Sequence, residues 1–350
     1  MSKYLSEKYR SLTAYTPGEQ PQDQKYVKLN TNESPFPPSA YAQRLARRAS
    51  GDLQLYSDPE CKALVSFAAE KFGISNDQII FTNGSDEVLN FAFMAFCDKS
   101  RPVVFPQITY GFYKVFAQLN NLPYEEIALN NDFTINVNDY IGIDKNIFIA
   151  NPNAPTGIAL SLEEIEKIVS SNPGRIVVID EAYVDFGAES AVKLVDKYEN
   201  LLVTQTFSKS RSLAGARLGF GIASKEIIDD LKLIKYSTNP YNINMMTMYA
   251  GIGALADAEY FDKNCKTIEE NRQFTTDRLD ELGFIVLPSK ANFIFAKKDG
   301  LDGEKIYLDL KARGVLVRHF DSDIINDYIR ITIGSREQME ILIKTLEEIL

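Results

Sequence analysis

Short apolar runs alternate with helical patterns through the first two thirds of the chain. The runs are rich in β-branched and aromatic residues, and amphipathic stretches separate them. This rhythm predicts an α/β fold in which a mostly parallel sheet is flanked by helices on both faces. The expected strands lie at 79–82, 103–105, 147–150, 176–180, 201–206 and 218–223.

The pattern changes after about residue 235. Longer helices and shorter strands follow, which predicts a smaller α+β domain. The expected helices are 244–255, 258–282 and 337–350, and the expected strands are 292–296, 315–317 and 328–333. We therefore expect three parts, which are an N-terminal arm over 1–38, a large domain over 39–235 and a small C-terminal domain over 236–350.

Composition narrows the class of protein. The 350 residues are 45% apolar and 25% charged, and no stretch reaches the ~20 apolar residues that cross a bilayer. Residues 1–10 lack the apolar core of a signal peptide, so a cytoplasmic enzyme is expected. The net charge of −10 argues against nucleic-acid binding. One histidine, His319, and three scattered cysteines give no metal-ligand pattern, so no metal is expected.

Polar clusters follow four of the predicted strands. They lie at 83–86, 151–157, 180–183 and 208–209. Because the carboxyl ends of parallel strands meet at one edge of a sheet, we expect these clusters to form a single site.

Lys209 follows the predicted strand 201–206, with Ser208 before it and Arg217 after it. The lysine offers an amine for an aldehyde, and the guanidinium of Arg217 suits a phosphate. Asp180 ends the preceding strand, where burying its carboxylate costs several kcal/mol unless a cation pairs with it. A pyridinium nitrogen is one such cation, although Asp180 is also a suitable helix cap.

Gly84, Ser85 and Asp86 open an apolar helix at the same predicted edge. The free N–H groups of a helix start bind anions well, so a phosphate is expected there. Ser85 is also a favoured cap, and the two roles are compatible. Arg330 lies in an otherwise apolar strand, where an unpaired arginine is costly. It predicts either an anionic ligand or a structural salt bridge.

The run 206–219 resembles the lysine motif of fold-type I aminotransferases. Its Leu-Ala-Gly-x-Arg-Leu-Gly tail is most similar to the histidinol-phosphate aminotransferase branch of class II. Segments 12–18, 28–35 and 241–244 resemble that branch too, with Ser34 in place of a usual asparagine. The resemblance implies the fold-type I architecture, pyridoxal 5′-phosphate (PLP) as cofactor, and ping-pong transamination in histidine biosynthesis. The implied reaction converts histidinol phosphate and 2-oxoglutarate to imidazole acetol phosphate and glutamate.

The resemblance also assigns roles to residues. Lys209 is implied as the catalytic lysine, Asp180 as the partner of the pyridinium nitrogen, and Tyr183 as a partner of the cofactor's phenolic oxygen. Tyr110 is implied to stack on the ring, and Tyr56 to reach the phosphate in the neighbouring subunit of a homodimer. Ser208 and Arg217 are implied to complete the phosphate site expected at Gly84, Ser85 and Asp86, which are cofactor-binding residues at the helix start. The implied substrate ligands are Arg330, Arg318, Tyr15 and Asn32.

One position departs from the family pattern. The loop 151–157 has Ala154 where the family usually has an asparagine that binds the phenolic oxygen. Either Asn153 replaces that contact or Tyr183 makes it alone. Close relatives leave other functions open, namely an aromatic amino acid aminotransferase, a threonine-phosphate decarboxylase and a PLP-sensing regulatory domain.

Overall fold

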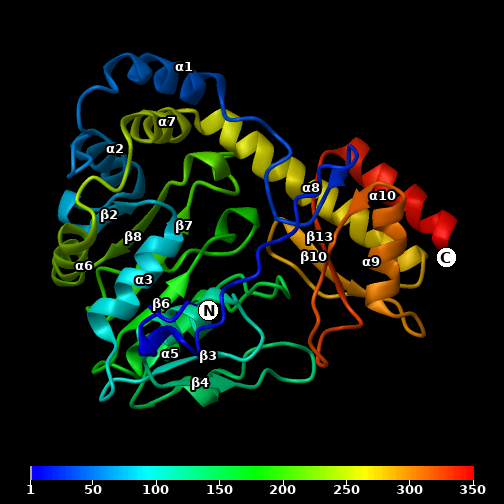
Figure 1. The fold of residues 1–350 in the computed structure, drawn as a ribbon, viewed down its shortest axis with the longest axis horizontal. Helices are drawn as coiled ribbons and strands as arrows, with labels where there is room; N and C mark the ends of the chain where they lie inside the picture. Colours follow the sequence, from blue (N-terminus) through cyan, green and yellow to red (C-terminus); the bar gives the residue numbers. More distant parts are fainter. Residues whose placement is uncertain (1) are drawn as a thin grey trace.

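The computed structural model describes residues 2–350, which build one large and one small sheet with helices packed on them (Figure 1). The larger sheet has seven strands in the order β2-β8-β7-β6-β5-β3-β4, and only β8 runs against the others. Its strands are β2 (Ile79–Thr82), β3 (Val103–Pro106), β4 (Tyr124–Ile127), β5 (Asn146–Ala150), β6 (Val177–Asp180), β7 (Leu201–Thr206) and β8 (Gly219–Ala223). The predicted α/β class and its mostly parallel sheet are confirmed.

Strand β4 is the member of this sheet that the apolar pattern does not predict. Its sequence is Tyr-Glu-Glu-Ile, and both glutamates are exposed. The strand lies at the edge of the sheet and pairs only with β3. An edge strand buries little side-chain area and tolerates charge, so its apolar signal is weak.

The smaller sheet is antiparallel and has the order β12-β13-β10-β9. Its strands are β9 (Ile285–Val286), β10 (Phe293–Lys297), β12 (Arg318–His319) and β13 (Ile329–Thr332). A separate parallel pair joins β1 (Val27–Lys28) to β11 (Val315–Leu316), which ties the N-terminal segment to the C-terminal part of the chain.

Ten α-helices lie within residues 2–350, and none has the length and apolar character that a membrane span requires. They are α1 (Ala40–Ala49), α2 (Lys62–Phe72), α3 (Ser85–Phe96), α4 (Phe112–Leu119), α5 (Leu162–Ser170), α6 (Lys225–Thr238), α7 (Met245–Ala256), α8 (Ala258–Glu281), α9 (Gly303–Ala312) and α10 (Arg336–Ile349). Short 3₁₀ turns are η1 (Glu7–Tyr9), η2 (Ser50–Asp52), η3 (Asn76–Gln78), η4 (Val137–Tyr140), η5 (Val184–Phe186), η6 (Ala191–Leu194) and η7 (Ala214–Ala216).

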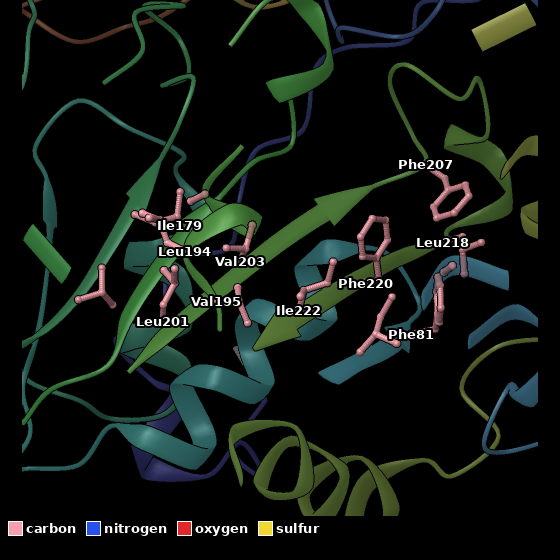
Figure 2. Close-up of a cluster of buried hydrophobic side chains, with 14 of the residues drawn as sticks. Phe81, Ile179, Leu194, Val195, Leu201, Val203, Phe207, Leu218, Phe220 and Ile222 are labelled. Carbon is pink, nitrogen blue, oxygen red and sulfur yellow. The ribbon is translucent and has the colours of Figure 1, made fainter. Parts of the chain in front are cut away.

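An aromatic cluster anchors the loop that follows β7. Phe207 packs against Phe220 of β8 with ring centroids 5.7 Å apart, and Phe81 of β2 lies 5.5 Å from Phe220 (Figure 2). All three side chains are buried. Because Phe207 is fixed in the core, Ser208 and Lys209 are held at the end of the sheet.

Helix α7 packs on α1 and α2, and its residues Met248 and Ala250 belong to the core of the larger sheet. Helix α8 instead contributes Cys265 and Ile268 to the core of the smaller sheet. We therefore propose that the large domain extends through α7 and that the small domain begins with α8, beyond the boundary expected at residue 236.

The contact between α7 and α1 is close enough to test. A Cβ added at Gly253 would lie 2.5 Å from the Cα of Ala42. We expect Gly253→Ala to destabilise the fold by about 1–3 kcal/mol through overpacking, measured as a lower midpoint of thermal denaturation. Gly51→Ala is the control, because no atom lies within 4 Å of its added Cβ. Equal midpoints for the two variants would contradict this packing.

Candidate active site

The carboxyl ends of the central parallel strands bring the predicted site residues together. In the sheet register, Asp180 at the end of β6 pairs with Ala150 of β5 on one side and Thr204 of β7 on the other. Lys209 follows the end of β7. The polar clusters after β5, β6 and β7 therefore share one edge, as the predicted topology requires.

Lys209 is half-buried and has no carboxylate within salt-bridge distance in residues 2–350. Its Nζ donates to the backbone carbonyl of Thr31 at 3.2 Å and lies 5.7 Å from the ring centroid of Tyr183. Burial, helped by the charge of Arg330, lowers the pKa of Lys209 to about 8. A neutral amine is therefore accessible near neutral pH.

Asp180 is 4% exposed and has no basic side chain beside it in the described chain. Its carboxylate accepts hydrogen bonds from Tyr113 Oη at 2.9 Å and Thr204 Oγ1 at 3.1 Å. Burial outweighs these bonds and raises the pKa of Asp180 to about 6. A cationic ring nitrogen from a ligand would complete the site, so the donor set fits a pyridinium.

The carboxylate of the neighbouring residue, Glu181, is hydrogen-bonded to protein groups on both oxygens. It accepts hydrogen bonds from the backbone N–H of Ala191 and the side chains of Ser190 and Gln205. Burial raises the pKa of Glu181 to about 7. These bonds tie the segment after β6 to the sheet, and Glu181 has no contact with Lys209.

The start of α3 forms an anion seat. Gly84 has φ = 83°, and the N–H groups of Ser85 and Asp86 have no acceptor in residues 2–350. A Cβ at Gly84 would meet Arg217 Nη2 at 2.7 Å, and one at Gly219 would meet Ser85 N at 2.2 Å. Glycine at both positions thus lets the backbone and Arg217 approach closely. This geometry fits a phosphate.

Two other predicted cofactor-binding residues lie at the same end of the sheet. Ser208 is buried, and its hydroxyl oxygen accepts from Thr206 Oγ1 at 3.0 Å. Its own hydroxyl hydrogen has no acceptor in residues 2–350. Asp86 accepts from Tyr110 Oη at 2.7 Å and from Arg217 Nη2 at 3.2 Å, so its observed contacts are with two predicted cofactor ligands.

The rings of Tyr15 in the N-terminal arm and Phe112 in α4 lie beside Tyr110. Tyr15 stacks on Phe112 with ring centroids 4.2 Å apart, and its ring lies 6.4 Å from that of Tyr110. The structure thus brings Tyr15 and Tyr110 together from segments far apart in the sequence. Tyr110 is fixed by its bond to Asp86 and by an edge-on contact with Tyr113.

Arg330 and Arg318 are directly opposite each other on β13 and β12, so their side chains share one face of the small sheet. Neither has a carboxylate partner in residues 2–350. Arg330 donates to the carbonyl of Asn30 at 2.9 Å, while its buried Nε has no acceptor. Arg318 donates to the carbonyls of Thr16 and Pro17. Adjacent unpaired cations are unfavourable unless an anion binds between them.

The loop after β5 gives Asn153 a structural role. Its two amide hydrogens go to the carbonyl of Ile108 at 3.0 Å and to Thr156 Oγ1 at 3.1 Å, and its oxygen accepts from Thr109. The side chain therefore has no hydrogen left for a cofactor, which opposes its predicted role as a ligand. Ala154 packs in the same apolar cluster as Tyr183.

Tyr56 stands apart from these residues. It is 82% exposed and stacks on Tyr241, with ring centroids 4.6 Å apart. Tyr113, Thr204 and Thr332 were not among the expected site residues, because a single tyrosine or threonine inside a helix or strand carries no motif. Thr204 is followed by Gln205 and Thr206 in β7, and Thr332 lies two residues after Arg330 in β13, so neither hydroxyl stands out from its strand.

Comparisons with known proteins agree with this geometry. The family model described as aminotransferase class I and II matches residues 24–346. The histidinol-phosphate aminotransferase of Brachyspira hyodysenteriae is 51% identical, covering 100% of this chain and 99% of the relative. The enzyme of the same name from Clostridium beijerinckii is 45% identical, covering 100% and 98%.

A solved structure shows the same fold. Histidinol-phosphate aminotransferase from Sinorhizobium meliloti, in complex with pyridoxal-5′-phosphate, has a TM-score of 0.89 at 23% identity, covering 100% of this chain and 99% of that chain. The family match spans most of the chain, and the curated relatives align over its whole length. The chain therefore belongs to the aminotransferase class I and II family.

Proposed function

We propose that this enzyme uses PLP to transfer the amino group of histidinol phosphate to a 2-oxo acid such as 2-oxoglutarate. The observation that carries the proposal is that two ionisable side chains at one edge of the sheet have no partner of opposite charge. They are the buried acid Asp180, whose pKa is raised, and Lys209, whose pKa is lowered. The names of the relatives at 51% and 45% identity support the choice of substrate.

When bound, PLP supplies an aldehyde carbon for amines and a ring that withdraws electrons. Lys209 Nζ would bind that carbon. Once the donor's amine displaces Lys209, the freed Nζ would take up a proton from the donor's Cα. Asp180 would hold the proton on the ring nitrogen. The α3 N-terminus and Arg217 would bind the cofactor's phosphate.

Arg330 and Arg318 form a second cationic site, apart from the anion seat at α3, and this second site suits a substrate anion. Arg330 and Arg318 lie side by side on the small sheet. Burial raises the pKa of Tyr15, and the charges of these two arginines oppose that rise. Two guanidinium groups match a phosphate monoester, which carries up to two negative charges. Tyr15 and Phe112 offer apolar faces for a planar ring beside it.

A second copy of this chain fits the exposed aromatic residues. Tyr56 and Tyr241 stack on each other at the surface, and Leu55 beside them is also exposed. We propose a homodimer in which this surface is covered and Tyr56 reaches the anion seat at the start of α3 in the partner subunit. The exposure of Tyr56 in the single chain supports this role.

The substrate proposal is tested by half-reactions. PLP-loaded enzyme is mixed separately with histidinol phosphate, phenylalanine, tyrosine and threonine phosphate, and the visible absorbance of the bound cofactor is followed. We expect histidinol phosphate to react fastest and to give a 2-oxo product, while Lys209→Ala stays folded and inactive. Faster conversion of phenylalanine or tyrosine would make the enzyme an aromatic aminotransferase, and loss of CO₂ from threonine phosphate would make it a decarboxylase.

Arg330→Ala tests the second cationic site. A hydrogen bond between charged groups contributes about 1.5–3 kcal/mol, so we expect the KM for histidinol phosphate to rise by about 10- to 100-fold. The affinity for PLP, measured by titrating apoenzyme, should change by less than about 3-fold. Arg313→Ala is the matched control at an exposed arginine. Equal losses of substrate and cofactor affinity would identify a structural arginine.

The lowered pKa of Lys209 predicts how the apoenzyme reacts with acylating reagents. The amine is protonated and inert below about pH 8 and neutral above it. We expect the labelling rate of Lys209, followed by peptide mass spectrometry, to have a midpoint near pH 8. Exposed Lys266 serves as the internal reference. A midpoint near pH 10 for Lys209 would contradict the effect of burial.

A further inference from the structure

The loop 151–157 leaves no free side-chain donor at the position where the family usually has an asparagine. Ala154, which packs in the same cluster as Tyr183, carries no donor, and both amide hydrogens of Asn153 are committed to other groups. Tyr183 is different because its hydroxyl hydrogen has no acceptor in residues 2–350. Given the proposed PLP function, Tyr183 can therefore donate to the cofactor's phenolic oxygen, whereas Asn153 and Ala154 cannot.

The hydroxyl oxygen of Tyr183 accepts a hydrogen bond from Asn32 Nδ2 at 3.0 Å, and both residues are buried. An oxygen that accepts from one side has its own hydrogen directed to another. The ring itself is held edge-on against Phe293, with centroids 5.0 Å apart. The bond from Asn32 thus decides where the hydrogen of Tyr183 points.

Thr332 fixes the orientation of the Asn32 amide. Its Oγ1 accepts from the backbone N–H of Asn32 at 2.9 Å and donates to Asn32 Oδ1 at 3.0 Å. Turning the amide over would leave the buried hydroxyl hydrogen of Thr332 without an acceptor, at a cost of about 1–3 kcal/mol. Nδ2 therefore faces Tyr183.

The backbone of Asn32 is equally constrained. Its φ is 56°, a left-handed conformation that asparagine adopts more readily than most residues. Its carbonyl accepts from Asn292 Nδ2 at 3.0 Å. With its backbone and both side-chain heteroatoms bonded to protein, Asn32 suits a positioning role better than the direct substrate contact expected from the sequence.

We propose that Asn32 is a positioning residue that turns the hydroxyl hydrogen of Tyr183 toward the phenolic oxygen of the bound cofactor. Thr332 holds Asn32 in place and lies on β13, the strand that also carries Arg330. Residues Arg330 and Thr332 are two apart and so project from the same face of that strand. The strand that supplies the substrate arginine therefore also sets the hydrogen bond at the cofactor.

The test is a pH titration of the visible absorbance of the PLP-loaded enzyme. Its midpoint reports the proton on the Lys209 nitrogen bound to the cofactor, next to the negatively charged phenolic oxygen. Losing a hydrogen bond to that oxygen leaves more charge on it, so the proton is held more tightly. We expect Asn32→Gly to raise the midpoint by about 0.5–1 pH unit.

Glycine is the chosen replacement because it keeps the left-handed backbone at position 32. Tyr183→Phe should raise the midpoint at least as much, and the double variant should show no further rise. Thr332→Val should raise it by a smaller amount, since it frees the Asn32 amide. Asn121→Gly is the matched control, because Asn121 has φ = 55° on the exposed surface, and its midpoint should equal that of the unchanged enzyme.

The outcomes separate this inference from the proposed function. An unchanged enzyme that takes up no PLP refutes the proposed function itself. If the unchanged enzyme titrates normally, an unmoved midpoint in Asn32→Gly overturns the positioning role. Shifts that add fully in the double variant overturn it too, as does loss of PLP from Asn32→Gly when Tyr183→Phe retains it. If Asn32→Gly does not fold, Thr332→Val decides the question by the same measurement.

Discussion

The site depends on the burial of two ionisable groups at neighbouring strand ends without partners of opposite charge. Asp180 has a raised pKa and Lys209 a lowered one, and in both cases burial is the largest cause. Taking such groups out of water costs free energy that the folded chain does not recover by itself. A ligand with a cationic ring nitrogen and an electrophilic carbon can recover that free energy.

The N-terminal segment links the two sheets at this site. Within three successive residues, the carbonyl of Asn30 accepts from Arg330, the carbonyl of Thr31 accepts from Lys209, and the amide of Asn32 donates to Tyr183. The backbone N–H of Thr332 also bonds to the carbonyl of Leu29, so this segment lies along β13. A movement of the small sheet relative to the large one would therefore change the hydrogen bonds of Lys209 and Tyr183.

The precision of the anion seat comes from packing rather than from charge alone. Gly219 of β8 lies so close to Ser85 that any side chain would collide with the backbone of α3. The aromatic cluster of Phe81, Phe207 and Phe220 supports β2, β8 and the loop that carries Lys209. Rigid support of this kind keeps phosphate donors and amine in fixed relation, as catalysis requires.

The sequence by itself determined the strand rhythm, the fold class, and the places of Lys209 and Asp180, because apolar periodicity and strand-end polar residues are local signals. It also carried the family resemblance through contiguous motifs. Local pattern could not identify β4, whose edge position tolerates glutamates, nor place α7 with the large sheet. Only the tertiary structure decided the hydrogen-bond partners. Hydrogen bonds join Asp180 to Tyr113 and Thr204, and Asn153 to Thr156 and the carbonyl of Ile108. Another series runs from Thr332 through Asn32 to Tyr183 and joins segments up to 300 residues apart. Such pairings are set by how the two sheets and the arm pack together, which no single stretch of sequence encodes.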